Sequence, residues 1–597
     1  MPEKQPSKWS RLPKMSFSSK DLSRRMKKVE GATVKHARRF VFRRMNNVRE
    51  VRRHVALWVL VVGLLIGASG LQLYWYQQSY RTTAAASDGT YAEAVLGPVE
   101  TLNPIFARSS AEESASRLMF SRLMTYDADG TLNYDLAESI ELSENKRTYT
   151  LKIRPDARWH DGIYVRAKDV VFTVNTLKDP ETRASISGWD DITVTAEDDR
   201  TVSFTLPAVF AAFPHALTFL PILPEHVLRD VAPSALRENS FSNNPVGSGP
   251  FSFRFTQSID ANESRRVVYL GRNLEYYGGA PKLERFQLHV YESSDAIVRA
   301  LNVSEVNAAA DVPVSDFDRV SQDRYDTNRQ PINSGVYALF NTDTGVLSDR
   351  DVRKALQVGT DTTAVREAVG PETPALSLPF INGQVEGAPK APAYNAKQAA
   401  EFLDEAGWRL NDEGLRQKGD ATLRLNVVTT QNSDQERALE ALQGQWRDLG
   451  ISVTTSIVDP SDPAQNFVQN TLQPRDYDVL VYRLTIGGDP DVYPYWHSSQ
   501  VSGGFNLSNY KSSTSDDALS SARDVTEKEL RDAKYATFAR QWLRDAPAIG
   551  LYQSTSQYIS NKGVSAQPVR QSIVGATDRY SDVLYWTVGE RFVNQTP

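Results

Sequence analysis

The longest apolar segment of the chain lies near its N-terminus. Residues 55–76, VALWVLVVGLLIGASGLQLYWY, are 22 residues without a charged side chain. At about 1.5 Å of rise per residue, a helix of this length covers roughly 33 Å, enough to cross a hydrocarbon layer of about 30 Å. Arginines precede the segment and aromatic residues lie at its far end: Arg49, Arg52, Arg53 and Tyr74, Trp75, Tyr76, Tyr80. This pattern predicts one transmembrane signal anchor, with residues 1–54 in the cytoplasm and the rest of the chain outside.

A cleavable signal peptide is the alternative interpretation of the same segment. The sequence AAAS at 84–87 is a small-residue cleavage motif. However, the 54 residues before the apolar run exceed the charged region of a normal signal peptide, and the run itself is longer than about 15 residues. The pattern therefore favours an uncleaved anchor, followed by a linker at 77–90.

Beyond the linker, short segments with strand-like and helix-like periodicity follow one another. Strand-like patterns occur at 149–153, 202–206, 451–453 and 477–482. One helix is expected between the N-cap Asn395 and Gly407, and a second is expected to begin at the capping-box pair Ser433 and Glu436. This order predicts an α/β protein in which helices cover sheets.

The charge along the chain is strongly asymmetric. Residues 1–54 hold 17 Lys and Arg against 4 Asp and Glu, a balance of +13, whereas the remainder carries −18. Such a head could bind nucleic acid or anionic lipid, but its cations are pairs spread over a polar stretch, which favours orientation of the anchor and lipid contact over nucleic-acid binding. Cysteine is absent, which excludes disulfides, thiolate zinc sites and a lipid anchor on an N-terminal cysteine.

Local signatures of catalysis are absent from the sequence. It has no phosphate-binding, dinucleotide-binding, zinc-protease or nucleophile-elbow motif, and the histidines beyond the anchor stand alone: His160, His215, His226, His289 and His497. The pair Asp489 and Asp491 allows a calcium or acid–base interpretation, but the flanking glycines and Pro490 favour a turn. The sequence predicts a binding protein without cofactor or metal; an anchored hydrolase whose site is assembled from distant residues stays open as an alternative.

A series of short segments, in order from about residue 92 to 590, resembles a known protein family. The sharpest stretch consists of YTLKIR at 149–154, WHDG at 159–162 and AKDV at 167–170. Further segments are TLNP at 101–104, PVGSGPF at 245–251, LFN at 339–341, DP at 489–490 and GFN at 504–506. Together they resemble solute-binding family 5, the extracellular binding proteins of peptide and nickel uptake transporters.

The resemblance implies an α/β fold of two hinged lobes, the large type II periplasmic-binding-protein architecture with an extra subdomain. The expected segments are lobe one at 88–120, 208–338 and 553–597, an inserted subdomain at 121–207, and lobe two at 339–552. The chain would cross between the lobes in two short apolar strands, near 336–340 and near 549–552. Ligand would lie buried between the lobes and favour their closure.

The main candidate for the ligand pocket is YRLTIGGDPDVYPYW at 482–496. Its glycines allow close backbone approach, and its aromatic side chains offer flat apolar surfaces with polar tips. A core aromatic cluster beneath a loop is an equal alternative. The candidate lining residues are Tyr482, Arg483, Ile486, Gly487, Asp489, Tyr493, Tyr495 and Trp496, with Asn103 added by analogy with the family.

The chain departs from the family pattern within this segment. Peptide-binding relatives place a carboxylate about four residues before the proline of the loop, where it pairs with the ligand's α-ammonium group; here that residue is Ile486. Arg483 stands where an aromatic residue is common and offers an anchor for carboxylate or phosphate. A ligand ammonium group would then need another partner, for instance Asp489 or Asp491.

These features predict a membrane-anchored, extracytoplasmic substrate-binding protein of an ABC importer. It would act as a monomer, bind peptides or a similar extended solute, and deliver them to permease and ATPase subunits. The alternative is a ligand sensor or interaction protein that uses the same binding fold and contacts a cytoplasmic partner through its basic head.

Overall fold

The computed structural model describes residues 52–79, 81–85, 88–260, 265–343, 345–459, 465–565 and 573–594. Most of the predicted basic head and the end of the AAAS motif lie outside these described residues. One compact unit spans Ala85–Glu590. Helix α3 (Arg52–Ser79) belongs to a separate unit, where β1 (Arg81–Ala85) pairs with β23 (Glu590–Asn594).

Helix α3 covers the apolar segment and extends past it at both ends. Over Arg52–Trp75 its mean hydropathy is 2.1, and it is the one helix among the described residues long and apolar enough to cross a membrane. A signal sequence near the N-terminus has the same length and composition. The structure therefore agrees with an anchor and equally with a signal sequence.

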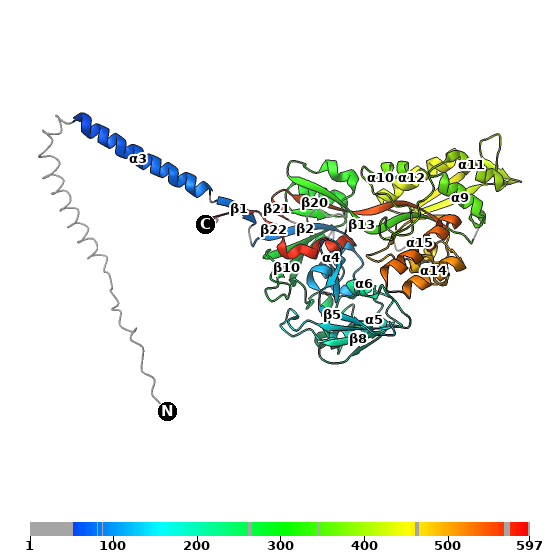
Figure 1. Ribbon diagram of the computed structural model, residues 1–597, viewed down its shortest axis with the longest axis horizontal. Coiled ribbons are helices and arrows are strands. Elements are labelled where there is room, and N and C mark those ends of the chain that lie inside the picture. Colours follow the sequence, from blue (N-terminus) through cyan, green and yellow to red (C-terminus); the bar gives the residue numbers. More distant parts are fainter. Residues whose placement is uncertain are drawn as a thin grey trace, which may run out of the picture. The chain divides into compact units, whose positions relative to one another are not determined.

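A single ten-stranded sheet runs through the larger unit. In spatial order its strands are β18 (Ser452–Val458), β17 (Arg424–Thr430), β19 (Val479–Thr485), β13 (Tyr325–Phe340), β20 (Ala548–Asn561), β12 (Ala308–Ala310), β2 (Thr90–Leu96), β11 (Arg285–Tyr291), β10 (Arg265–Arg272) and β9 (Phe251–Asp260). Strands β17 and β19 are parallel, as are β2 and β11. The two ends of the sheet are joined through β13 and β20, which lie side by side (Figure 1).

The sequence predicts two short apolar strands that cross between the lobes, and in the structure both strands are longer than predicted. Strand β13 has 16 residues and β20 has 14, and they pair antiparallel from Tyr325↔Asn561 to Leu339↔Ala548. Only one half of β13 is apolar, so the hydrophobic pattern predicted a strand in that half alone. The polar half is also a strand because its backbone forms hydrogen bonds with β20. The register shifts between Pro331 and Gly335, where the strand passes from one part of the sheet to the other.

The burial of apolar side chains defines two lobes. On one side of the crossing strands a core forms around Tyr91 and Phe286. On the other side, one core surrounds Phe340 and Trp446 and another surrounds Trp542, on opposite faces of the sheet. Separate cores connected by two strands give a two-lobed α/β protein, because each lobe buries its own apolar surface.

Smaller sheets and helices complete the unit. The segment predicted as an inserted subdomain contains the sheet β5 (Ala137–Leu142), β6 (Thr148–Ile153), β8 (Thr201–Thr205) and β7 (Thr193–Ala196), with α5 (Ala167–Lys178). The remaining short strands are β3 (Met124–Tyr126), β4 (Leu132–Tyr134), β14 (Arg409–Leu410), β15 (Arg416–Lys418), β16 (Ala421–Thr422), β21 (Val564–Ser565) and β22 (Thr587–Val588). The remaining α-helices of this unit are α4 (Ser110–Met119), α6 (Phe213–Ala216), α7 (Glu225–Leu228), α8 (Ser294–Asn302), α9 (Arg350–Val358), α10 (Thr362–Val369), α11 (Ala396–Glu405), α12 (Ser433–Asp448), α13 (Tyr493–Trp496), α14 (Ser513–Arg523) and α15 (Lys528–Asp545).

Both predicted helices are present, and one of the two predicted caps is wrong. Helix α11 begins after Asn395, whose side chain accepts a hydrogen bond from the Gln398 backbone N–H. Helix α12 is capped by Asn432, one residue before the predicted Ser433, and the Asn432 side chain accepts from the backbone N–H groups of residues 434 and 435. Asn and Ser are similarly good caps, so the choice depends on where the backbone leaves the extended conformation.

Candidate functional site

The loop that follows β19 is fastened to the crossing strand β13. The backbone N–H groups of Ile486 and Gly487 both donate to the Asn333 carbonyl oxygen, at 2.9 and 3.0 Å. Gly487 has φ of 83°, a conformation that favours glycine. At Gly488 an added Cβ would lie 2.5 Å from the Tyr126 hydroxyl oxygen, so only glycine permits this approach. The loop therefore rests on β13 and against a residue of the predicted inserted subdomain.

The two carboxylates of this loop are already paired. Asp489, which is 8% exposed, accepts from Nη1 and Nη2 of Arg531 at 2.7 Å each. Asp491 accepts from Nε and Nη2 of Arg523 at 3.0 and 2.7 Å. A ligand ammonium group would have to compete with these arginines for either carboxylate. Among the described residues, no cluster of His, Asp and Glu has the geometry of a metal site.

Several predicted lining residues belong to the protein interior. Trp496 is 1% exposed and packs edge-on against Trp542, with ring centroids 5.5 Å apart. Ile486 is buried in the same core. Asn103 is buried beneath the first loop, where its side chain caps the turn Pro104–Phe106.

The remaining tyrosines of the segment are partly buried. Tyr482 packs on Phe467, with ring centroids 5.9 Å apart. The Tyr495 hydroxyl donates to the Thr485 carbonyl at 2.6 Å, and burial raises the Tyr495 pKa to about 12. Tyr493 lines a cavity.

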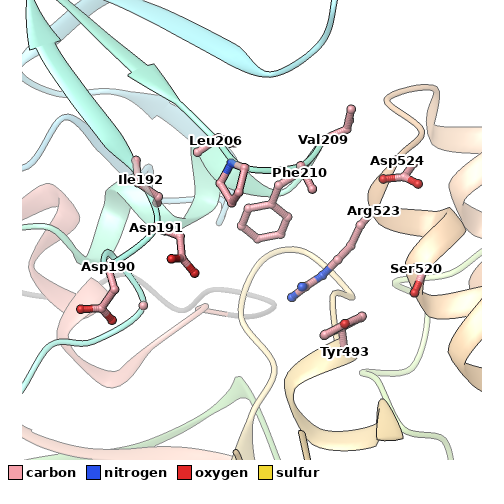
Figure 2. Close-up of a pocket in the computed structure, with 13 residues that line it drawn as sticks. Asp190, Asp191, Ile192, Leu206, Val209, Phe210, Tyr493, Ser520, Arg523 and Asp524 are labelled. Carbon is pink, nitrogen blue, oxygen red and sulfur yellow. The ribbon is translucent and has the colours of Figure 1, made fainter. Parts of the chain in front are cut away.

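That cavity, of about 550 Å³, lies between the segments 188–192 and 206–210 on one wall and α13 and α14 on the other. Figure 2 shows the Arg523 side chain between Phe210 and Tyr493. Its guanidinium carbon is 3.8 Å from the Tyr493 ring centroid and 4.9 Å from that of Phe210. The Ala211 backbone N–H also donates to the Arg523 carbonyl at 3.1 Å. Elements that the sequence assigns to different lobes thus meet at Arg523.

A second contact of this kind joins His215, on α6, to Asp489 in the loop after β19. His215 Nδ1 and the Tyr126 hydroxyl share a hydrogen bond of 2.9 Å. The other ring nitrogen, His215 Nε2, lies 4.0 Å from Asp489 Oδ2. Burial lowers the pKa of His215, and the nearby Asp489 charge opposes that shift. We call the set Tyr126, Phe210, Ala211 and His215 against Gly488, Asp489 and Arg523 the rim contact.

Three charged residues near one another in the fold form no side-chain hydrogen bond or ion pair with a described residue: Glu113 on α4, Arg122 just after α4, and Arg483 on β19. The side chains of Glu113 and Arg483 are exposed. Glu113 has exposed surface, yet desolvation by the surrounding protein raises its pKa, against the opposing charges of Arg122 and Arg483. We call these three residues the interlobe charge cluster.

The position of Arg483 in the sheet places it beside further unpaired polar atoms. Arg483 is opposite Val336 in β13, and Val336 is opposite Tyr552 in β20, so the three side chains point to one face. The Tyr552 and Ser554 hydroxyl groups are buried and have no hydrogen bond to a described residue. Of this group the sequence singled out Arg483 alone as a candidate site residue.

A family model and individual known proteins agree on what this chain is similar to. A family model described as bacterial extracellular solute-binding proteins, family 5 Middle, matches residues 131–505. The chain is 27% identical over 526 residues to the oligopeptide-binding protein AppA of Bacillus subtilis, covering 84% of this chain and 94% of that protein. It is 23% identical to the probable D,D-dipeptide-binding periplasmic protein DdpA of Escherichia coli, covering 78% and 88%.

Solved structures share the fold. AppA from Bacillus subtilis in complex with a nonapeptide matches with a TM-score of 0.69 and 23% identity, covering 85% of this chain and all of that chain. NikZ from Campylobacter jejuni in complex with Ni(L-His) matches with a TM-score of 0.69 and 24% identity, covering 83% and 99%. The larger unit thus has the two-lobed α/β architecture of periplasmic binding proteins.

Proposed function

The chain belongs to family 5 of the bacterial extracellular solute-binding proteins, and we propose that it is the substrate-binding protein of an ABC importer for peptides or a similar extended solute. The ligand would be held between the two lobes and delivered to permease and ATPase subunits. The relatives named above are binding proteins, which agrees with the predicted non-enzymatic role.

One observation in this chain supports a ligand between the lobes: the interlobe charge cluster. Arg122 Nε is buried without a hydrogen bond to a described residue; such a donor is costly, and a polar ligand can supply the missing contact. Two of these charges lie on or just after α4 and the third lies on β19, so a ligand that contacted both elements would favour the closed arrangement by its higher affinity for it.

We also propose that α3 keeps the protein at the membrane, with the acidic larger unit outside. The chain has no cysteine for a lipid anchor, and α3 has the length and hydropathy of a spanning helix. Retention would keep the binding unit near its transporter without lipidation. The binding unit would act as a monomer.

Native mass spectrometry of the full chain, purified in detergent from its own host, tests the ligand. We expect a ladder of co-purifying peptides, and we expect deletion of the gene to lower uptake of labelled peptides. A single sugar or a metal chelate in place of the ladder would contradict peptide binding. Unchanged uptake of every solute together with an altered signalling response would favour the sensor interpretation.

A further inference from the structure

We propose that the turn between α14 and α15 is part of a latch that holds the two lobes closed through contacts of the protein itself. The inference goes beyond the proposed function, because it assigns part of the closing free energy to the protein and none of it to a particular ligand. The latch contains the Arg523 part of the rim contact and adds a second attachment at Lys146. Its members are Arg523, Thr526 and Glu527 in lobe two, against Lys146, Phe210 and Ala211 in lobe one and its inserted subdomain.

The first attachment is the Arg523 side chain, which stands between two aromatic rings (Figure 2). Its guanidinium carbon lies 3.8 Å from the Tyr493 ring centroid and 4.9 Å from the Phe210 ring centroid. The face of each ring attracts a cation. Tyr493 belongs to lobe two and Phe210 to the opposite side, so the contact with Phe210 exists only while the lobes are closed.

The end of α14 also accepts a backbone hydrogen bond from the opposite side. Arg523 is the last residue of α14, and the last carbonyl groups of a helix have no partner within it. The Ala211 backbone N–H donates to the Arg523 carbonyl oxygen at 3.1 Å. This hydrogen bond fixes the segment that carries Phe210 in register with the end of α14.

The second attachment lies at the start of α15. Lys146 Nζ donates to Thr526 Oγ1 at 3.2 Å and to Glu527 Oε1 at 3.5 Å. The side chains of Lys146 and Glu527 are 39% and 56% exposed, so water and salt screen this ion pair. We therefore expect Lys146 to contribute less to closure than Arg523.

Arg523 is held in position from within lobe two. Asp491 accepts from its Nε and Nη2 at 3.0 and 2.7 Å, and the Tyr493 ring lies over its guanidinium group. Because Asp491 and Tyr493 belong to the same lobe as Arg523, they can order its side chain before Phe210 arrives. Closure then loses little side-chain entropy at this residue.

A latch of this kind raises the fraction of closed molecules through contacts that no ligand makes. A ligand that binds the closed arrangement has an apparent affinity proportional to that fraction. Loosening the latch should therefore weaken ligand binding although every contact to the ligand is kept.

The absence of cysteine allows the closed fraction to be measured directly. Thr195→Cys on β7 and Glu440→Cys on α12, both at exposed positions, introduce two sites for nitroxide labels in the full chain. Pulsed electron paramagnetic resonance in detergent micelles then gives the distribution of label distances after co-purified solute has been washed out. We expect most wild-type molecules to show the short distance of the closed arrangement.

Substitutions in this labelled background test the two attachments. Phe210→Ala is expected to raise the ratio of open to closed molecules about fivefold, because it removes one face of the cation–π contact. Phe210→Leu should act like Phe210→Ala, since leucine restores apolar volume without a ring, whereas Phe210→Trp should stay closed. Lys146→Met should raise the ratio about twofold at low salt and have no effect at high salt.

Two matched controls remove the same side chains elsewhere. Phe219→Ala deletes a phenylalanine that is 51% exposed and follows Phe210 by nine residues. Lys152→Met breaks an ion pair with Glu138 that lies within the inserted subdomain. Both should leave the label distances unchanged. Thermal unfolding of each variant reports whether it is folded.

The outcomes separate the latch from the proposed function. The latch is overturned if the washed wild type is mostly open, if folded Phe210→Ala matches Phe219→Ala, or if Phe210→Leu is as closed as the wild type. Adding the co-purified solute to Phe210→Ala should restore the short distance. If the wild type is closed but the solute leaves Phe210→Ala open, the latch is supported and ligand-driven closure is contradicted.

Discussion

Arg531 and Asp489 form a two-point ion pair in which both nitrogen–oxygen distances are 2.7 Å. The side chains are 12% and 8% exposed. Burial alone would lower the pKa of Arg531, but its hydrogen bonds to Asp489 and the Asp489 charge outweigh burial and raise it. The pair ties the loop after β19 to α15 and thereby sets the position of Gly488 against Tyr126.

We expect Arg531→Met to destabilise the protein by about 3–5 kcal/mol, because it leaves the Asp489 carboxylate buried and uncompensated. Thermal unfolding of the full chain in detergent measures the change. The matched control is Lys397→Met, which removes an exposed ion pair with Glu401 and should cost less than about 1 kcal/mol. Equal effects of the two substitutions would show that the Asp489 pair is dispensable for stability.

The folding stability should fall in acid because of a buried histidine. The His160 Nε2–H donates to the Gly249 carbonyl at 3.0 Å, and the Gly247 backbone N–H donates to His160 Nδ1 at 3.2 Å, so the ring is neutral. Burial lowers its pKa from 6.5 to about 4. Its contribution is fully present above pH 6.5 and is lost as the pH falls toward 4, since the unfolded chain binds the proton first.

The pKa difference at His160 corresponds to a loss of roughly 3 kcal/mol at most between pH 6.5 and 4. We expect His160→Gln to flatten the pH dependence of the thermal midpoint over this range. A residual slope should stay, because burial also lowers the pKa of His289 to about 4. An unchanged slope in the variant would mean that His160 is protonated as readily in the folded protein as in the unfolded chain.

The close approach of Gly488 to Tyr126 predicts how the rim contact can be opened. In Gly488→Ala the new Cβ would lie 2.5 Å from the Tyr126 hydroxyl oxygen, and overpacking of this kind costs about 1–3 kcal/mol. We expect a larger radius of gyration by small-angle X-ray scattering, since the lobes separate to relieve the clash.

A second glycine provides the control for this substitution. Gly487→Ala adds backbone strain at φ of 83° but meets no atom within 4 Å, so it should lower stability without changing the radius of gyration. Tyr126→Ala should restore compactness to Gly488→Ala and leave Gly487→Ala unaffected. A Gly488→Ala protein as compact as wild type would contradict a steric role for this contact.

Local sequence patterns predicted the elements well because capping and periodicity are properties of a few neighbouring residues. Asn395 and Gly407 mark the ends of α11, and the apolar alternation of 149–153 marks β6. The same reasoning failed where tertiary pairing decides the structure. The polar half of β13 is a strand because β20 supplies its hydrogen-bond partners, which no pattern within β13 reveals.

The site was predicted less completely, for a related reason. Arg483 could be singled out because it lies in a segment with a family pattern, whereas the pairing of Asp489 with Arg531 and of Asp491 with Arg523 is a property of the folded chain. Trp496 follows the alternative that the sequence left open, a core aromatic cluster, because its side chain is buried among apolar residues.

The nature of α3 gives the last prediction. If it is an uncleaved anchor, the wild-type chain should stay in the membrane pellet after alkaline carbonate washing and retain its basic head on N-terminal sequencing. Replacing Leu64 and Leu65 with arginine places two charges near the helix centre, at about 2.5–3.5 kcal/mol each on insertion scales, and should release the protein or prevent its export. Leu274→Arg, at a leucine 68% exposed in the larger unit, should leave retention unchanged because it adds charge outside the span. A wild-type protein recovered in the soluble fraction, with an N-terminus near residues 84–87, would identify α3 as a signal sequence.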